Sequence, residues 1–236
     1  GSIHVNHGGT EMGQGLHTKM GQVAARVLGV SLERVQVNAT RTDKVPNTSP
    51  TAASSGSDLN GMAVRDAVNQ IRDRLVRFLV DHFDCEVARI EIGNDQVVVG
   101  DKTFSFAEVV KLAYMNRIHL SAAGFYKTPK IEFDFEKGSG MPFYYFANGA
   151  ATAEVIVDTR TGEYRVVQVD ILHDVGRSLN PAIDIGQIEG GFVQGMGWLT
   201  TEELLWDDTG RLISNSPANY KIPTAYDVPE IFKVSL

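Results

Sequence analysis

Two stretches in the first third of the chain carry apolar residues at the spacing of an amphipathic helix. One covers residues 14–28, and the other covers residues 58–82, where Ser57 is a candidate N-cap. Residues 35–39 alternate between apolar and polar positions, which predicts a strand. Residues 40–57 are rich in Thr, Ser, Pro and Gly and are expected to form the loop before the second helix.

The middle of the chain predicts smaller elements. Residues 90–92 and 97–99 are apolar runs on either side of a turn, which is typical of a hairpin. Ser105 and Glu108 have the spacing of a capping box, which predicts a short helix that ends near Met115.

The last third is expected to be rich in strands. Residues 144–158 and 164–174 are long apolar runs, and a glycine-rich helix is predicted over residues 188–205. Helices and strands mix without strict βαβ alternation, so the fold class is predicted to be α+β. The chain is expected to form one region, with a subdivision into a helix-rich part with a small sheet (1–120) and a strand-rich part (121–236).

Composition narrows the class of protein. The 236 residues are 43% hydrophobic and 22% charged, as in an ordinary globular domain, and the net charge of −7 disfavours nucleic acid as a partner. A single cysteine, Cys85, excludes an internal disulfide framework and a cysteine-based zinc or iron–sulfur site, and it fits a cytoplasmic location. The sequence contains no run of about 18 apolar residues, so no membrane span is predicted.

Both ends of the chain fall in strand-like stretches, residues 2–6 and 231–236, so we expect a fragment of a larger protein.

The glycine-rich stretch at residues 8–15 is the sharpest candidate for chemistry. Glycines at a strand-to-helix turn let the backbone approach a ligand with its N–H groups pointing outward. Gln14 offers two donors and an acceptor, but it stands where a nucleotide P-loop needs Lys, so that motif is excluded. A tight turn that packs a helix against a strand would explain the same glycines.

Two further segments are weaker candidates. Residues 51–57 place small hydroxyl residues at a helix N-terminus, which would suit an anion, but a capped helix after a flexible loop is the favoured explanation of this segment taken alone. Residues 186–191 place Gln187 among glycines at a predicted helix start, while close packing explains the later glycines of that helix. His4 and His7 are three apart, which puts them on opposite faces of a strand and makes a shared metal unfavourable.

Several segments, taken together, resemble the molybdopterin-binding region of xanthine dehydrogenases and oxidases. They are residues 8–19, 45–54, 174–190 and 220–223, and they follow the order of that family over nearly the whole chain. The resemblance implies the mixed helix-and-sheet fold of the molybdenum-cofactor-binding domain of xanthine dehydrogenase and aldehyde oxidase.

The resemblance also implies which residues contact the cofactor. Gly13 and Gln14 would lie against molybdopterin, Gln187 would hydrogen-bond the pterin or the oxo end of molybdenum, and Thr152 would lie near the pterin. The pterin and phosphate side would be lined by Ala53, Ser54, Ser55, Gly56 and Ser57. The family holds its metal through cofactor sulfurs, so no metal-ligating side chain is expected.

Some family features are expected outside this chain. The general base would be a Glu in a Gly-Glu-Pro motif beyond Leu236, so no catalytic residue is assigned here. The parent would hydroxylate hypoxanthine to xanthine and xanthine to urate, and the isolated fragment is expected to be inactive. Its partners would be the remaining domains of the large subunit, an iron–sulfur and FAD subunit and the purine substrate, and an exposed apolar face would favour self-association.

Two alternatives remain open at this point. One is a related molybdenum hydroxylase that acts on aldehydes or N-heterocycles. The other is a cofactor-binding module without catalysis.

Overall fold

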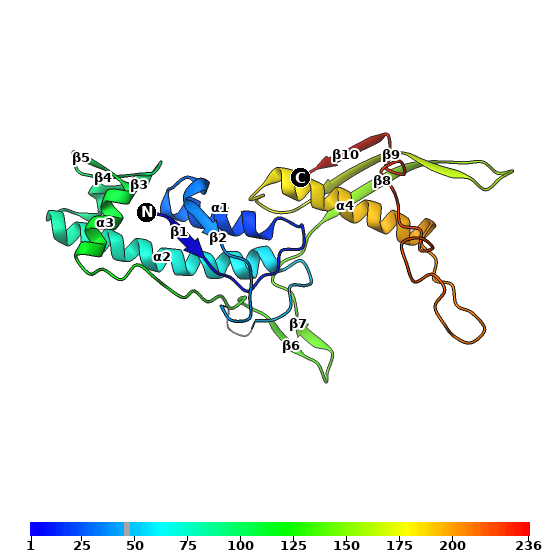
Figure 1. Ribbon diagram of the computed structural model, residues 1–236, viewed down its shortest axis with the longest axis horizontal. Coiled ribbons are helices and arrows are strands. Elements are labelled where there is room, and N and C mark those ends of the chain that lie inside the picture. The colour runs from blue at the N-terminus through cyan, green and yellow to red at the C-terminus, as the bar shows by residue number, and fades with distance from the viewer. Residues whose placement is uncertain (45–47) are drawn as a thin grey trace. The chain divides into compact units, whose positions relative to one another are not determined.

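The chain contains both helices and sheets and forms two compact units. The computed structural model describes residues 1–44 and 48–236, and the units are Gly1–Tyr144 and Tyr145–Leu236 (Figure 1). The predicted mixture of helices and sheets is confirmed.

The first unit opens with a strand, a helix and a second, parallel strand. β1 (Ile3–Val5) pairs with β2 (Val35–Val37), and α1 (Leu16–Leu28) connects them, followed by a 3₁₀ turn, η1 (Leu32–Arg34). α1 begins two residues later than predicted, because Gly15 at its N-cap has a positive φ of 75°. The predicted end at Leu28 is confirmed: Gly29 follows with a φ of 64°.

The long helix α2 (Gly56–Phe83) packs against α1 (Figure 1). Its N-cap is Ser55, so the prediction that Ser57 caps the helix was wrong, and Ser57 lies in the first turn. The reason is a tight turn just before the helix, in which Ala53 and Ser54 have positive φ and Ser55 N–H donates to Ala52 O. Gly56 can therefore start the helix, a position at which its low helix propensity matters little.

A three-stranded antiparallel sheet and a short helix follow, after the 3₁₀ turn η2 (Val87–Arg89). The sheet consists of β3 (Ile90–Gly93), β4 (Gln96–Val99) and β5 (Lys102–Ser105), and α3 (Phe106–Met115) begins directly after β5. The predicted hairpin, capping box and helix end are confirmed, while the strand β5 was not predicted.

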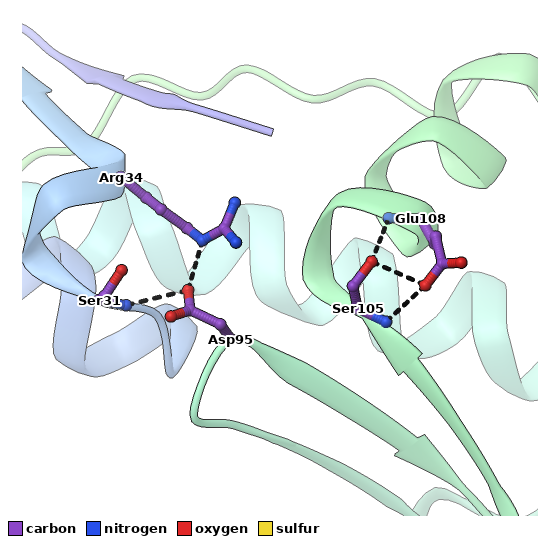
Figure 2. Close-up of polar contacts among 5 residues, drawn as sticks. All are labelled: Ser31, Arg34, Asp95, Ser105 and Glu108. Carbon is purple, nitrogen blue, oxygen red and sulfur yellow. Dashed lines mark hydrogen bonds and ion pairs between the residues drawn. The ribbon is translucent and has the colours of Figure 1, made fainter.

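The turn between β3 and β4 is joined to the end of α1. Asp95 Oδ1 accepts a hydrogen bond from Ser31 N–H at 3.1 Å and forms an ion pair with Arg34 Nε at 2.6 Å (Figure 2). The backbone N–H of Asp95 also donates to Gly29 O at 2.9 Å. The capping box of α3 lies in the same view, where Glu108 accepts from both Ser105 N–H and Ser105 Oγ (Figure 2).

The first unit holds the apolar core. Side chains of α1, α2, the small sheet and α3 form one cluster, whose most enclosed members are Met20, Leu75, Leu79, Val97 and Val109. A short hairpin, β6 (Glu132–Asp134) and β7 (Ser139–Met141), completes this unit and was not predicted. Its two strands are too short to show an alternating pattern.

The second unit is a three-stranded sheet with one helix. β9 (Tyr164–His173) lies between β8 (Gly149–Val157), to which it is antiparallel, and β10 (Ile231–Ser235), to which it is parallel. The helix α4 (Pro181–Thr200) contacts β10 through Phe192 and Phe232. Among the residues described in this unit, the buried apolar side chains are Val169 and Pro229.

The limits of α4 differ from the prediction of residues 188–205. Asn180 caps the helix, since its side chain accepts from Ile183 N–H at 3.2 Å, and Pro181 occupies the first helical position. Gln187 is therefore inside the helix and not at its start, as had been expected.

Close packing explains fewer of the α4 glycines than expected. A Cβ added at Gly190, Gly191 or Gly195 would meet no described atom within 4 Å, whereas one at Gly197 would meet the ring of Pro223. The packing interpretation holds for Gly197 and is wrong for the other three within the described part of the chain. No helix in the described part of the structure is long and apolar enough to cross a membrane.

Candidate functional site

Two loops of the first unit meet where α1 and α2 begin. The backbone N–H of Thr10 donates to Thr51 Oγ1 at 2.8 Å. A Cβ added at Gly8 would lie 2.5 Å from Thr48 Cγ2, and one added at Gly56 would lie 3.4 Å from Leu16 Cδ2. The structure thus brings the two predicted segments together, with the N-termini of both helices at the same end of the unit (Figure 1). Val45, Pro46 and Asn47, which belong to the second motif, lie outside the described residues.

The glycine-rich loop is organised around one carboxylate. Glu11 Oε1 accepts from Gly13 N–H at 2.9 Å and from Gly15 N–H at 3.0 Å, and Glu11 Oε2 accepts from His17 N–H at 2.9 Å. The expectation that the N–H groups of these glycines point outward was therefore wrong for Gly13 and Gly15. Burial raises the pKa of Glu11, but the three backbone donors and the nearby His17 ring together lower it below its ordinary value.

Gln14 closes the same loop with its side-chain amide. Its Oε1 accepts from Met12 N–H at 2.5 Å, and its Nε2 donates to Thr10 O at 2.7 Å. Gly13 is exposed, has a φ of 101°, and would place an added Cβ in open space. The loop therefore presents backbone at Gly13 to a ligand. The two bonds of the half-buried Gln14 amide use one of its N–H groups and one of its oxygen lone pairs, which leaves a second donor and a second acceptor for a ligand.

The loop before α2 has an open helix N-terminus. Ala53 and Ser54 are exposed and have φ of 56° and 55°, a conformation that non-glycine residues adopt at a cost. Ser55 forms no side-chain cap, because its hydroxyl donates to Ala52 O at 3.1 Å. The first N–H groups of a helix have no partner within the helix, so Gly56 and Ser57 present donors at this end.

Two histidine rings contact each other next to the glycine-rich loop. His7 is 6% exposed, its Nδ1 accepts from Gly9 N–H at 3.1 Å, and its ring meets the His17 ring edge-on at a centroid distance of 4.9 Å. Burial, followed by the His17 ring, lowers the pKa of His7 to about 4. The Nε2 atoms of both rings are buried without a described partner.

Thr152 and Gln187 belong to the second unit. Thr152 is exposed on β8, where it lies opposite Asp170 of β9, and Gln187 is exposed on α4. Tyr220, which opens the fourth motif, donates its hydroxyl to Glu202 Oε2 at 2.6 Å, and this contact raises the pKa of Tyr220. Glu202, which accepts this hydrogen bond, is half-buried.

Three residues have structural roles in the site that had not been expected. Thr51 joins the two loops, while Glu11 and His7 accept hydrogen bonds from backbone N–H groups within the glycine-rich loop. One signal for Glu11 was available, since no Ser, Thr, Asp or Asn stands at the start of α1 and the helix therefore needs an acceptor from upstream. The residues described contain no group of three or more His, Cys, Asp or Glu able to hold a metal ion.

Comparison with known proteins identifies the family. Residues 1–229 match the model of the molybdopterin cofactor-binding domain. The chain belongs to this family. This molybdopterin cofactor-binding domain is 49% identical to xanthine dehydrogenase of Oryza sativa subsp. japonica and 47% identical to xanthine dehydrogenase/oxidase of Gallus gallus. Both alignments cover the whole chain but only 16% of each relative.

Solved structures share the fold of this molybdopterin cofactor-binding domain. Quinoline 2-oxidoreductase from Pseudomonas putida 86 matches with a TM-score of 0.83 and 30% identity over 100% of this chain and 29% of that one. The Cu,Mo-CO dehydrogenase matches with a TM-score of 0.82 at 21% identity, again over 100% of this chain and 29% of the other, which supports the fold alone.

Proposed function

We propose that this chain is the part of a xanthine dehydrogenase that holds the molybdenum cofactor. The observation that carries the proposal is the junction of the two loops at the N-termini of α1 and α2, bound by Thr10 and Thr51. The similarity to xanthine dehydrogenases over the whole chain supports the choice of parent. The parent would hydroxylate hypoxanthine to xanthine and xanthine to urate.

The residues at this junction fit an anionic, hydrogen-bonding cofactor. The N-terminus of α2 has no side-chain cap and offers the N–H groups of Gly56 and Ser57 together with serine hydroxyls, which suit the phosphate of molybdopterin, although Asp58 in the first turn offsets part of the positive helix end. This part of the site consists of Ala53, Ser54, Ser55, Gly56 and Ser57. The backbone at Gly13 and the amide of Gln14 suit the polar edge of a pterin.

In the second unit, Gln187 and Thr152 are the residues that we propose as cofactor contacts. Both side chains are exposed and polar, so each is available to a ligand. When bound, the cofactor supplies the molybdenum centre at which a purine carbon is hydroxylated. The residues of this chain bind and orient it, and we assign no proton-transferring residue among them. The iron–sulfur clusters and FAD, the remaining domains of the large subunit and the cytoplasmic location follow from the same proposed parent.

Measuring molybdenum and pterin in the purified chain tests the proposal. The chain is produced in a host that makes molybdopterin, molybdenum is quantified by elemental analysis, and released pterin is quantified by fluorescence. We expect both to copurify in equal amounts. A chain that carries neither, together with a full-length protein that keeps its cofactor when Gln14, Ser54 and Gln187 are all replaced by Ala, would contradict the proposed site.

A related hydroxylase is the second candidate, because quinoline 2-oxidoreductase shares the fold at 30% identity. The higher identity to xanthine dehydrogenases favours purines over other N-heterocycles. Comparing hypoxanthine, quinoline and an aldehyde as substrates of the full-length protein separates the two candidates.

A further inference from the structure

Glu11 is the acceptor on which the glycine-rich loop converges. Both of its carboxylate oxygens are engaged, and its three donors are the backbone N–H groups of Gly13, Gly15 and His17. Hydrogen bonds to a charged acceptor are stronger than neutral ones, so this contact dominates the local structure of the loop.

The start of α1 has no other cap. Gly15 at the N-cap has no side chain, and the first turn of the helix contains no acidic residue. Glu11 therefore supplies both the acceptor and the negative charge that a helix N-terminus favours. α2 differs, because its N-cap Ser55 makes no side-chain cap bond. Each helix start has one carboxylate nearby: Glu11 accepts from the first N–H groups at α1, whereas Asp58 in the first turn of α2 accepts from Leu59 N–H and leaves the N–H groups of Gly56 and Ser57 to a ligand.

We propose that Glu11 is a positioning residue for the cofactor, an inference that rests on the function proposed above. Its carboxylate fixes the backbone of residues 13–17, and this holds Gln14 and Gly13 in place for the pterin. By occupying the N-terminus of α1, it also directs the anionic end of the ligand to the N-terminus of α2. Glu11 acts through the loop backbone and does not itself touch the cofactor.

The proposed role predicts an effect that would not occur if Glu11 only capped the helix. Removing the charge of Glu11 should open a new anion site at α1, while weakening the order of the loop. Inorganic phosphate is the probe, and backbone amide signals of the isotopically labelled chain are the readout. In the wild type we expect phosphate to shift the amides of Gly56 and Ser57 and to leave those of Gly13, Gly15 and His17 unchanged.

The variants are Glu11→Gln, which is isosteric and uncharged, and Glu11→Asp, which keeps the charge on a shorter side chain. For E11Q we expect phosphate to shift the amides of Gly15 and His17 as well. Exchange of these amides with solvent should rise about fivefold, as expected for loss of one capping interaction. E11D should show the faster exchange without the new phosphate response, because its charge still repels the anion.

Glu108→Gln is the matched control. Glu108 is also a carboxylate that caps a helix, through Ser105 N–H at 2.7 Å, but it lies at α3 in the small-sheet part of the unit. E108Q should lose stability without changing molybdenum content or the amides of the loop, whereas E11Q should lower molybdenum and pterin content about fivefold.

Different results overturn the two proposals. If E11Q leaves exchange at Gly13, Gly15 and His17 and the phosphate response as in the wild type, Glu11 does not position the loop. If phosphate never shifts Gly56 or Ser57, but E11Q still exposes the α1 amides to it, the role of Glu11 stands and the proposed phosphate site at α2 is wrong.

Discussion

The backbone N–H of Thr10 donates to the side-chain oxygen of Thr51 at 2.8 Å, across 41 residues of sequence. This contact joins the loop before α1 to the loop before α2. We expect Thr51→Val, which keeps the shape but removes the acceptor, to lower cofactor content about fivefold, the equivalent of one hydrogen bond. Thr51→Ser should retain it. Thermal unfolding should change little, because Thr10 is exposed, and equal molybdenum content in both variants would contradict the prediction.

A negative charge at the start of α2 should raise the stability of the helix and weaken the binding of an anionic ligand. Ser55→Asp places a carboxylate at the N-cap, which should stabilise the helix by about 0.3–1 kcal/mol and repel a phosphate. Ser55→Asn is the neutral control of the same size. The expected result is a raised melting temperature with lost molybdenum for S55D, and retained molybdenum for S55N. If S55D retained the cofactor, the cofactor phosphate could not bind at this position.

His7 should make the first unit sensitive to acid. The folded chain holds the pKa of His7 at about 4, against 6.5 for an unperturbed histidine, so below pH 6.5 the unfolded chain binds a proton that the folded chain does not. Stability should therefore fall as pH drops from about 6.5 to about 4, by about 2–3 kcal/mol in total. Glu11, whose pKa is lowered, adds its own loss only below about pH 4.5.

Urea unfolding between pH 5 and 6.5 isolates the histidine. His7→Asn keeps an acceptor for Gly9 N–H and removes the titrating group, so its stability should hardly change over this range. His4→Asn is the control, because His4 is exposed on β1, the strand that ends shortly before His7. If H7N and the wild type show the same slope, another group is responsible for the acid sensitivity.

Asp95 should stabilise the first unit by two separable means, its backbone conformation and its side-chain contacts. Its φ of 62° suits the hairpin turn, and its carboxylate contacts Ser31 and Arg34 (Figure 2). Asp95→Gly keeps the turn and loses the contacts, so the drop in its urea midpoint measures the contacts alone. Asp95→Ala should lose more, because alanine resists a positive φ. Equal midpoints for D95G and the wild type would show that the contacts contribute nothing.

Two glycines should respond to alanine with opposite signs. At Gly29, with a φ of 64°, an added Cβ would lie 2.6 Å from Ile92 O and 2.7 Å from Gly93 Cα. Gly29→Ala should therefore cost at least about 2 kcal/mol. At Gly190 an added Cβ meets no described atom, and Gly190→Ala should raise the stability of α4 by about 0.5–1 kcal/mol. Hydrogen exchange of the backbone amides in α1 measures the effect of Gly29→Ala, and exchange of those in α4 measures the effect of Gly190→Ala.

Helical periodicity and local caps were enough to predict most of the first unit. The repeat of Leu16 and Met20 and the Ser105–Glu108 capping box are local signals, and both helices formed where they indicated. Parallel pairing of Ile3 with Val35 depends on a distant partner, so its register could not be predicted from local patterns. The start of α4 was missed because the glycines around Gln187 outweighed the Asn180–Pro181 start signal.

The sequence marked the two loops that meet in the first unit, but it did not predict the hydrogen bonds within them. Glycines and small hydroxyl residues marked both loops. The roles of Glu11 and Gln14 depend on the positive φ of Gly13 and Gly15, which turns backbone N–H groups back toward side chains. A glycine admits that conformation without requiring it, so the pattern alone predicted donors that face outward.

The parallel pairing of β1 and β2 links the glycine-rich loop to the stability of the first unit. Parallel neighbours cannot be joined by a tight turn, and here the crossover runs through α1. The glycine-rich loop lies within that crossover, between β1 and α1. A ligand that binds only the folded shape of this loop therefore adds its binding free energy to the stability of the whole βαβ unit.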